Sequence, residues 1–178
     1  MNTFLSGRKI KFLLTLVPLF CFSRQTKQQE EYSIKTLFIY NFTKYIEWPN
    51  TDRKSFFEID VLGESDIIKP LEELARSKKI NQKTIVIKVI GDAGSITGDM
   101  IFLPASESRQ LGTVLKNCRG KNILVVTEAP NLAVKGSVIN FKVIDNNIRF
   151  ELNQTAAKNS GLKLSHELIE LSIPVNAQ

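Results

Sequence analysis

Side chains that could carry catalytic chemistry are scarce in this sequence. The 178 residues include one histidine, His166, and two cysteines, Cys21 and Cys118. Transition-metal sites normally need three or four ligands of this kind, so we expect no metal site. A Ser-His-Asp or Cys-His device would have to use His166 as its base. His166 lies in the helix-like segment SHELIEL, where we interpret it as a partly exposed helix residue.

Motifs that bind nucleotides are also missing. The chain has no Walker motif and no dinucleotide fingerprint, because Gly91, Gly94 and Gly98 are too widely spaced and read as a loop. The carboxylate pairs Glu30-Glu31 and Glu72-Glu73 are explained by charge on helix surfaces. We therefore predict a protein without enzymatic activity and without a cofactor. A hydrolase of unfamiliar type rests on no positive feature.

Polar residues follow two of the expected strands and could bind a ligand. Glu64 and Ser65 come after the first strand, and Glu151 and Asn153 lie where a later strand leads into a helix. Ligands of open α/β sheets gather at the carboxyl ends of strands, so these four residues are candidates for contacts to a small polar molecule. The alternative is that Asn153 caps the helix and that Glu151 is simply solvated.

Aromatic residues cluster in the segment FIYNFTKYIEWP. We take Tyr40, Tyr45 and Trp48 as candidate contacts to a protein partner. Core packing is the alternative reading for aromatic residues at helical spacing, and it covers Phe38, Phe42 and Tyr45. Tyr40 falls on a different face of the expected helix from that trio.

The elements that would position these residues alternate along the chain. Apolar residues at steps of three and four predict a helix over residues 32–48, which Pro49 ends. Strands are expected over 57–62, 84–90, 100–103 and 122–127, with helices over 66–77 and from residue 106 or 108 to 118. Two alternating runs joined by Asp145-Asn146-Asn147 predict a hairpin, and a helical region interrupted at Gly161 follows. The expected fold class is α/β: a three-layer domain with a mostly parallel central sheet flanked by helices, and an antiparallel hairpin near the C-terminus.

The first twenty-three residues have the layout of a secretory signal peptide. Arg8, Lys9 and Lys11 precede an apolar stretch that is too short to span a bilayer permanently. We expect a cleaved leader over 1–23, a disordered spacer over 24–31 and a single domain over 32–174. A retained membrane anchor is the alternative, and Cys21 raises the question of a lipoprotein, which the bulky Phe20 before it disfavours.

Export limits the partners that we expect. Removing the three basic residues of the leader lowers the formal charge from +6 to +3, so nothing demands nucleic acid or another polyanion. Cys118 would be the one cysteine left, which excludes an intramolecular disulfide.

Two end segments carry a family resemblance. IKTLFIYNFTKYIEWP (34–49) and IRFELNQTAAKNSGLKLSHELIEL (148–171), together with GSVINF (136–141), resemble the YfiR family of small exported bacterial proteins. The order and spacing of the motifs hold across the expected mature chain, while the middle is only loosely similar. Relatives often carry a cysteine where this chain has Asp99, so we do not expect the disulfide-linked redox control that such relatives allow.

The resemblance implies a periplasmic regulator that is not an enzyme. Its best-understood relatives repress an inner-membrane diguanylate cyclase through the periplasmic part of that cyclase, and an outer-membrane OmpA-like lipoprotein relieves the repression. The expected output is the level of cyclic-di-GMP and hence biofilm growth, and the family pattern allows a homodimer. A periplasmic small-molecule sensor using Glu64, Ser65, Glu151 and Asn153 is the alternative, and the two functions are compatible.

Overall fold

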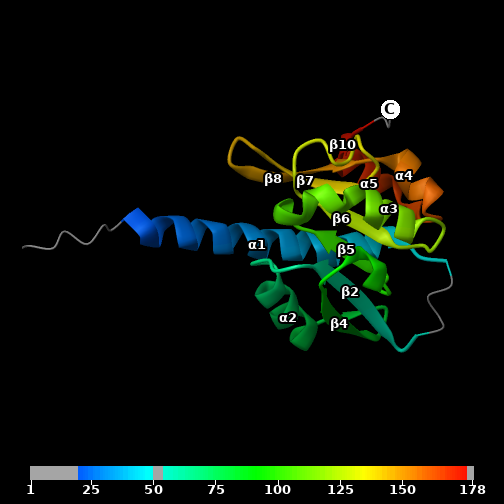
Figure 1. Ribbon diagram of the computed structural model, residues 1–178, viewed down its shortest axis with the longest axis horizontal. Helices are drawn as coiled ribbons and strands as arrows, with labels where there is room; N and C mark the ends of the chain where they lie inside the picture. The colour runs from blue at the N-terminus through cyan, green and yellow to red at the C-terminus, as the bar shows by residue number, and fades with distance from the viewer. Residues whose placement is uncertain (1–19, 50–53, 176–178) are drawn as a thin grey trace, which may run out of the picture.

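The computed structural model describes residues 20–49 and 54–175 (Figure 1). Most of the predicted signal peptide, residues 1–19, therefore lies outside the described residues. The centre of the fold is an eight-stranded sheet in the order β10-β8-β7-β6-β5-β2-β4-β3. Its strands are β2 (Phe56–Leu62), β3 (Lys79–Ile80), β4 (Lys83–Ile90), β5 (Met100–Leu103), β6 (Leu124–Thr127), β7 (Ile139–Ile144), β8 (Asn147–Leu152) and β10 (Ile173–Pro174).

The sheet is mostly parallel. Strands β4, β2, β5, β6 and β7 are parallel neighbours, and β10 runs parallel to β8. The antiparallel pairs are β3 with β4 at one edge and the β7–β8 hairpin. Asp145 and Asn146 join β7 to β8 with φ values of 49° and 61°, as a tight hairpin turn requires. The predicted fold class is confirmed.

Helices cover both faces of the sheet. In β5, Met100 and Phe102 belong to one apolar cluster, while Ile101 and Leu103 belong to a second. Because side chains alternate across a strand, these two clusters lie on opposite faces of the sheet. The first cluster is shared with α1 (Phe20–Tyr45), α2 (Ile68–Ser77), α4 (Gln154–Asn159) and α5 (His166–Leu171); the second is shared with η2 (Ala93–Ser95) and α3 (Leu111–Cys118), which the 3₁₀ helix η3 (Ala105–Gln110) precedes. The three layers follow from β5 being buried on both faces.

Helix α1 corrects two expectations. The segment 24–31, expected to be a disordered spacer, is helical, because its Lys, Gln, Glu and Arg residues are good helix formers that extend a helix already anchored in the core. Lys27 and Gln28 also hydrogen-bond to Asn146 and Asp66. Figure 1 shows this part of α1 projecting beyond the sheet.

The C-terminal end of the same helix also differs from the prediction. The helix stops at Tyr45, and β1 (Ile46–Glu47) pairs antiparallel with β9 (Lys163–Leu164) in a separate small sheet. The carbonyl of Tyr45 accepts a hydrogen bond from the N–H of Ser165, which continues the pairing past Leu164. Backbone bonds to a segment more than a hundred residues away thus override the helical period, a choice that local sequence does not encode.

A buried carboxylate holds the connection that leads from β4 to β5. Asp60 on β2 is fully buried, and its Oδ2 accepts hydrogen bonds from the N–H groups of Thr97 and Gly98, both at 2.8 Å. Its Oδ1 has no hydrogen-bond partner among the described residues. Burial raises the pKa of the Asp60 carboxyl above its ordinary 3.8, although the two backbone N–H groups oppose that shift.

The raised pKa of Asp60 predicts a pH-dependent stability. The folded state binds the proton more tightly than the unfolded chain, so this contribution to stability is complete below pH 3.8 and is lost as the pH rises through the raised pKa. The variant Asp60→Asn keeps an acceptor but cannot ionise. Urea unfolding across the acidic range should show Asp60→Asn gaining stability relative to the wild type as the pH increases. Parallel stability curves for Asp60→Asn and the wild type across this pH range would contradict the prediction.

Candidate functional site

The candidate site lies at the carboxyl ends of the parallel strands. From β2 the chain moves to β4 on one side and then returns to β5 on the other, so strand order reverses between β2 and β5. Such a reversal leaves a crevice at the strand ends, where α/β proteins place ligands. Glu64 follows β2, Ala105 follows β5 and Glu128 follows β6. Helix α1 passes over these ends, because Tyr32 and Gln28 contact Glu128 and Asp66.

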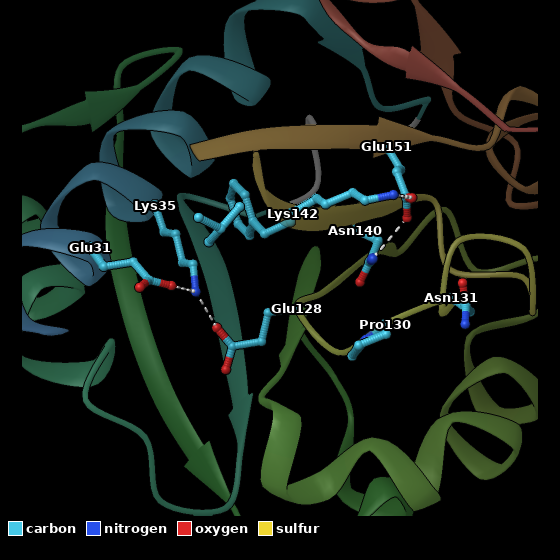
Figure 2. A pocket seen from close by; sticks show the side chains of 10 residues that line it. Glu31, Lys35, Glu128, Pro130, Asn131, Asn140, Lys142 and Glu151 are labelled. Atoms are coloured by element: carbon cyan, nitrogen blue, oxygen red, sulfur yellow. Dashed lines mark hydrogen bonds and ion pairs between the residues drawn. The ribbon is translucent and has the colours of Figure 1, made fainter. Parts of the chain in front are cut away.

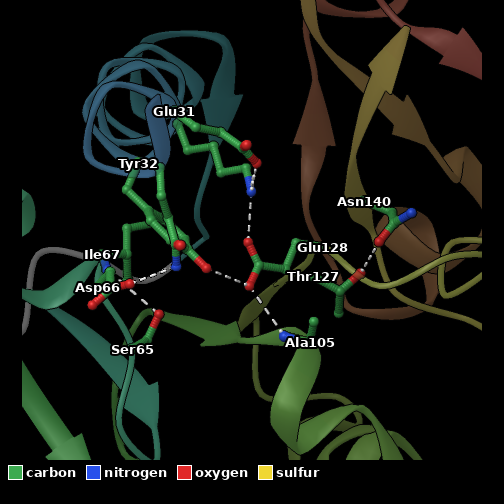
Figure 3. Close-up of polar contacts among 11 residues, drawn as sticks. Glu31, Tyr32, Ser65, Asp66, Ile67, Ala105, Thr127, Glu128 and Asn140 are labelled. Atoms are coloured by element: carbon green, nitrogen blue, oxygen red, sulfur yellow. Dashed lines mark hydrogen bonds and ion pairs between the residues drawn. The ribbon is translucent and has the colours of Figure 1, made fainter. Parts of the chain in front are cut away.

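Glu128 is the centre of a polar cluster, which Figure 3 shows. Its Oε2 lies 2.7 Å from the Nζ of Lys35, which in turn lies 2.6 Å from a carboxylate oxygen of Glu31. Its Oε1 accepts hydrogen bonds from the hydroxyl of Tyr32 and from the N–H of Ala105, both at 3.1 Å. We call Glu31, Tyr32, Lys35, Ala105 and Glu128 the Glu128 cluster. It connects α1 to the ends of β5 and β6.

Most of the charge in the Glu128 cluster is out of solvent. The side chains of Lys35 and Glu128 are only 6% and 5% exposed, whereas that of Glu31 is 33% exposed. Burial, followed by the negative charge of Glu128, raises the pKa of the Tyr32 hydroxyl well above its ordinary value of 10. Tyr32 therefore stays protonated and donates to Glu128. Removing one member of this buried ion pair would strongly lower the stability of the fold, because the remaining charge would be buried without an opposite charge beside it.

A second buried network joins the hairpin to β6. The hydroxyl of Thr127 donates to the side-chain oxygen of Asn140 at 2.7 Å, and the amide of Asn140 donates to Oε2 of Glu151 at 2.9 Å. Lys142 pairs with the other oxygen of Glu151 at 3.1 Å. Asn140 and Glu151 stand directly opposite each other on β7 and β8. Glu151 is thus buried and paired, not simply solvated.

A cavity of about 300 Å³ separates the Glu128 cluster from this second network (Figure 2). Its lining residues are Glu31, Lys35, Glu128, Pro130, Asn131, Asn140, Phe141, Lys142, Val143 and Glu151. We call it the hairpin cavity. It presents ammonium, carboxylate and amide groups from α1, from the loop after β6 and from the hairpin, beside the apolar side chains of Pro130, Phe141 and Val143. The cavity can therefore accept both polar and apolar groups.

The structure does not bring the four candidate ligand residues together. Glu151 lines the hairpin cavity, whereas Glu64 and Ser65 line a cavity of about 410 Å³ between α1 and α2. Asn153 is fully buried: it caps α4 by accepting from the N–H of Ala156, and it donates to the carbonyl of Ala133. For Asn153 the capping alternative therefore holds. Ligand binding by the other three residues stays a prediction.

The candidate partner residues also differ from one another. Trp48 is only 8% exposed; its indole N–H donates to the carbonyl of Asp99, and its ring packs edge-on against Phe57. It belongs to the core, because β1 turns the chain inward, so we correct its assignment as a partner contact. Tyr40 and Tyr45 are partly buried against the core, and the Tyr40 hydroxyl donates to the carbonyl of Lys79. A partner contact through these two tyrosines stays a prediction.

The residues that could carry covalent or metal chemistry lie outside this site. The His166 side chain is 80% exposed and faces Glu170 along α5. Cys118 is buried, and burial raises the pKa of its thiol to about 11, so the thiolate is disfavoured. Within residues 20–49 and 54–175 no group of three His, Cys, Asp or Glu side chains could hold a metal ion.

Sequence reasoning did not identify Lys35 and Glu128 as a site. Lys35 lies one turn before Ile39 and two turns before Phe42, and both of these residues are fully or almost fully buried. A lysine on the apolar side of a helix was therefore the signal in the sequence that could have indicated a buried ion pair. Glu128 directly follows the wholly buried strand β6, which was the second signal. Nothing local in the sequence indicates that the two residues, 93 positions apart, form a pair.

Loss of Lys35 should strongly destabilise the domain. Lys35→Ala leaves the buried Glu128 carboxylate without its cation, which typically costs about 3–5 kcal/mol. Lys44→Ala, on the exposed side of the same helix, should cost below about 1 kcal/mol. Urea unfolding measures both variants. Equal effects would show that Lys35 contributes only helix propensity.

Loss of Asn153 should destabilise the domain through two hydrogen bonds. Asn153→Ala removes the cap of α4 and leaves the Ala133 carbonyl without its donor, together about 2–3 kcal/mol. Asn153→Asp keeps the cap and should recover part of this loss. The neighbouring exposed variant Gln154→Ala serves as the control in the same unfolding experiment, and its midpoint should match that of the wild type.

The comparisons with known proteins concern nearly the whole described domain. The model of the DUF4154 family, described as YfiR/HmsC-like, matches residues 32–173. No curated protein matches the chain. Within the part of the chain that the structure describes, no helix combines the length and apolar character that a membrane crossing needs. Since the match covers far more than half of the chain, the protein belongs to the YfiR/HmsC-like family.

Proposed function

We propose that this protein is a non-enzymatic periplasmic regulator that binds the periplasmic part of an inner-membrane signalling protein and represses it. The observation that carries the proposal is the family match over residues 32–173, because this family fits periplasmic regulators of cyclic-di-GMP signalling. By family analogy the target is a diguanylate cyclase, and an outer-membrane OmpA-like lipoprotein relieves the repression. The signal-peptide layout of residues 1–23 supports the location.

The described chemistry is consistent with regulation by contact. The polar groups at the strand ends are engaged in buried ion pairs and hydrogen bonds, and His166 and Cys118 lie in unrelated places.

Helix α1 offers a surface for a protein partner. Leu37 is 57% exposed and Ile34 is 38% exposed, both on a helix whose other side is core. Tyr40 lies about one turn after Leu37, and Tyr45 lies about two turns after Leu37. The helix therefore presents aliphatic and aromatic groups that could serve as binding anchors. We propose these four residues as contacts to the signalling protein.

A small-molecule sensor is the second candidate function. The hairpin cavity supports it, because about 300 Å³ lined by Lys35, Lys142 and Glu151 can hold a small polar ligand. A ligand there would contact both α1 and the hairpin and so could bias binding of the partner. Such a ligand would raise the melting temperature, since it would bind the folded state only.

Membrane capture tests the proposed function. Tagged protein without residues 1–23 should recover an integral membrane protein with a periplasmic domain from solubilised host membranes, and deletion of the gene should raise cyclic-di-GMP.

Leu37→Asp should lower the recovery, because a carboxylate would be buried at the contact. Val89→Asp, at an exposed valine on β4, is the matched control and should bind like the wild type. Recovery of no integral membrane protein would refute the proposal.

A further inference from the structure

The β7 strand has an open edge next to the hairpin cavity. Pairing of β6 with β7 ends at Thr127 and Asn140, whereas pairing of β7 with β8 continues to Ile144 and Asn147. The four residues Phe141–Ile144 therefore have a neighbouring strand on one side only, within the described residues. We call this segment the β7 edge. The hairpin cavity lies along it, because Phe141, Lys142 and Val143 line that cavity.

The hairpin turn determines which backbone groups face the open side. Asp145 and Asn146 form the two central turn residues, so the carbonyl of Ile144 faces Asn147 on β8. Backbone groups alternate along a strand, and those of Val143 and Phe141 therefore point away from β8. The carbonyl of Ile139 fits this alternation, since it lies 3.3 Å from the side-chain hydroxyl oxygen of Thr127 on the β6 side. Val143 thus offers its N–H and C=O to an added strand.

The two faces of the β7 edge differ in chemistry. One face is apolar: Phe141 and Phe150 pack against Phe38 of α1, and Val143 and Ile148 are the next pair towards the turn. Val143 is 53% exposed. The other face is basic, because Lys142 and Arg149 stand directly opposite each other. Glu151 pairs with Lys142, while Arg149 has no ion-pair partner among the described residues.

We infer that the β7 edge binds an extended segment of a partner protein as an added strand, with apolar side chains alternating with acidic ones. Apolar side chains would meet Val143 and Phe141 on the α1 face, and acidic side chains would meet Lys142 and Arg149 on the other. Main-chain hydrogen bonds would supply affinity, and the two faces would supply specificity. The inference deepens the proposed function, because the segment would belong to the proposed signalling partner.

The surroundings favour a single strand over a second copy of this chain. The cavity beside the edge is bounded by α1 through Glu31 and Lys35 and by the loop after β6 through Pro130 and Asn131 (Figure 2). One extended chain fits between these walls more easily than a second hairpin with its own helix. Pairing of two β7 edges would also bring two copies of Lys142 and Arg149 together, and like charges on neighbouring strands repel.

Binding of a defined peptide tests the inference. The probe is a capped peptide of repeating Val-Glu units, compared with a Val-Lys peptide of equal length. The Val-Glu peptide should bind the protein and slow hydrogen exchange of the Val143 amide, and the Val-Lys peptide should bind at least about tenfold more weakly. Failure of the Val-Glu peptide to bind, or equal binding of both peptides, would overturn the inference.

Two variants separate strand addition from other binding. Val143→Pro removes the outward N–H but no bond to β8, and proline is tolerated at such edges, so the fold should survive while peptide binding falls about tenfold or more. Val143→Thr keeps the N–H and the side-chain shape and should bind nearly as the wild type. Arg149→Glu should weaken binding too, although it creates a favourable pair with Lys142. Unchanged affinity of Val143→Pro would refute strand addition.

Two further readouts distinguish this inference from its rivals. If Val143→Pro still captures the membrane protein as the wild type does, the proposed function stands and the β7 edge is not its contact. If the wild type is a dimer in solution and Val143→Pro is a monomer, the occupant is a second copy of this chain, which overturns the inference. Capture lost with Val143→Pro but kept with Val143→Thr supports it.

Discussion

The buried ion pair between Lys35 and Glu128 ties the longest helix of the molecule to the end of a central strand. Two charges separated by 2.7 Å and almost free of solvent can persist only when further hydrogen bonds compensate them, and Tyr32 and the Ala105 N–H do so. Phe38 and Phe42 then pack on Phe141 and Phe150, which brings α1 against the hairpin. The position of α1 thus depends on the ion pair at Lys35 and on the aromatic packing of Phe38 and Phe42, one and two turns further along the helix.

The same ion pair helps to explain why β7 has an open edge. Glu128 follows the last residue of β6, and its side chain is committed to α1 and to the N–H of Ala105. The chain then leaves the sheet through Ala129 and Pro130, so β6 has only four residues while β7 has six. Phe141–Ile144 consequently extend beyond their neighbour. The hairpin cavity occupies the place that a longer β6 would have filled.

The sequence predicted the fold better than the site. Wholly apolar segments such as 100–103 carry the β5 assignment on their own, and the Asp145-Asn146 turn identifies the hairpin. The cap at Asn153 was recognised as an alternative from its place between strand and helix. Other features depend on distant partners: Ile46 and Glu47 become a strand because Lys163 and Leu164 lie beside them, and Trp48 is buried for the same reason. The Glu128 cluster also joins residues that are far apart in the sequence, so the sequence alone cannot predict which of them form the ion pair.

An exposed edge with Phe, Val and Ile would ordinarily invite aggregation, and the charges around it limit that risk. Lys142 lies within the edge and Arg149 directly across from it, and a lysine on an edge strand discourages pairing with an identical edge. Glu151 keeps Lys142 paired while no segment is bound, but leaves Arg149 to the solvent. A segment with acidic side chains would reduce the electrostatic repulsion between Lys142 and Arg149, whereas a second copy of this chain would add further positive charge and increase that repulsion. The charges that protect the edge from itself are therefore the ones that select its partner.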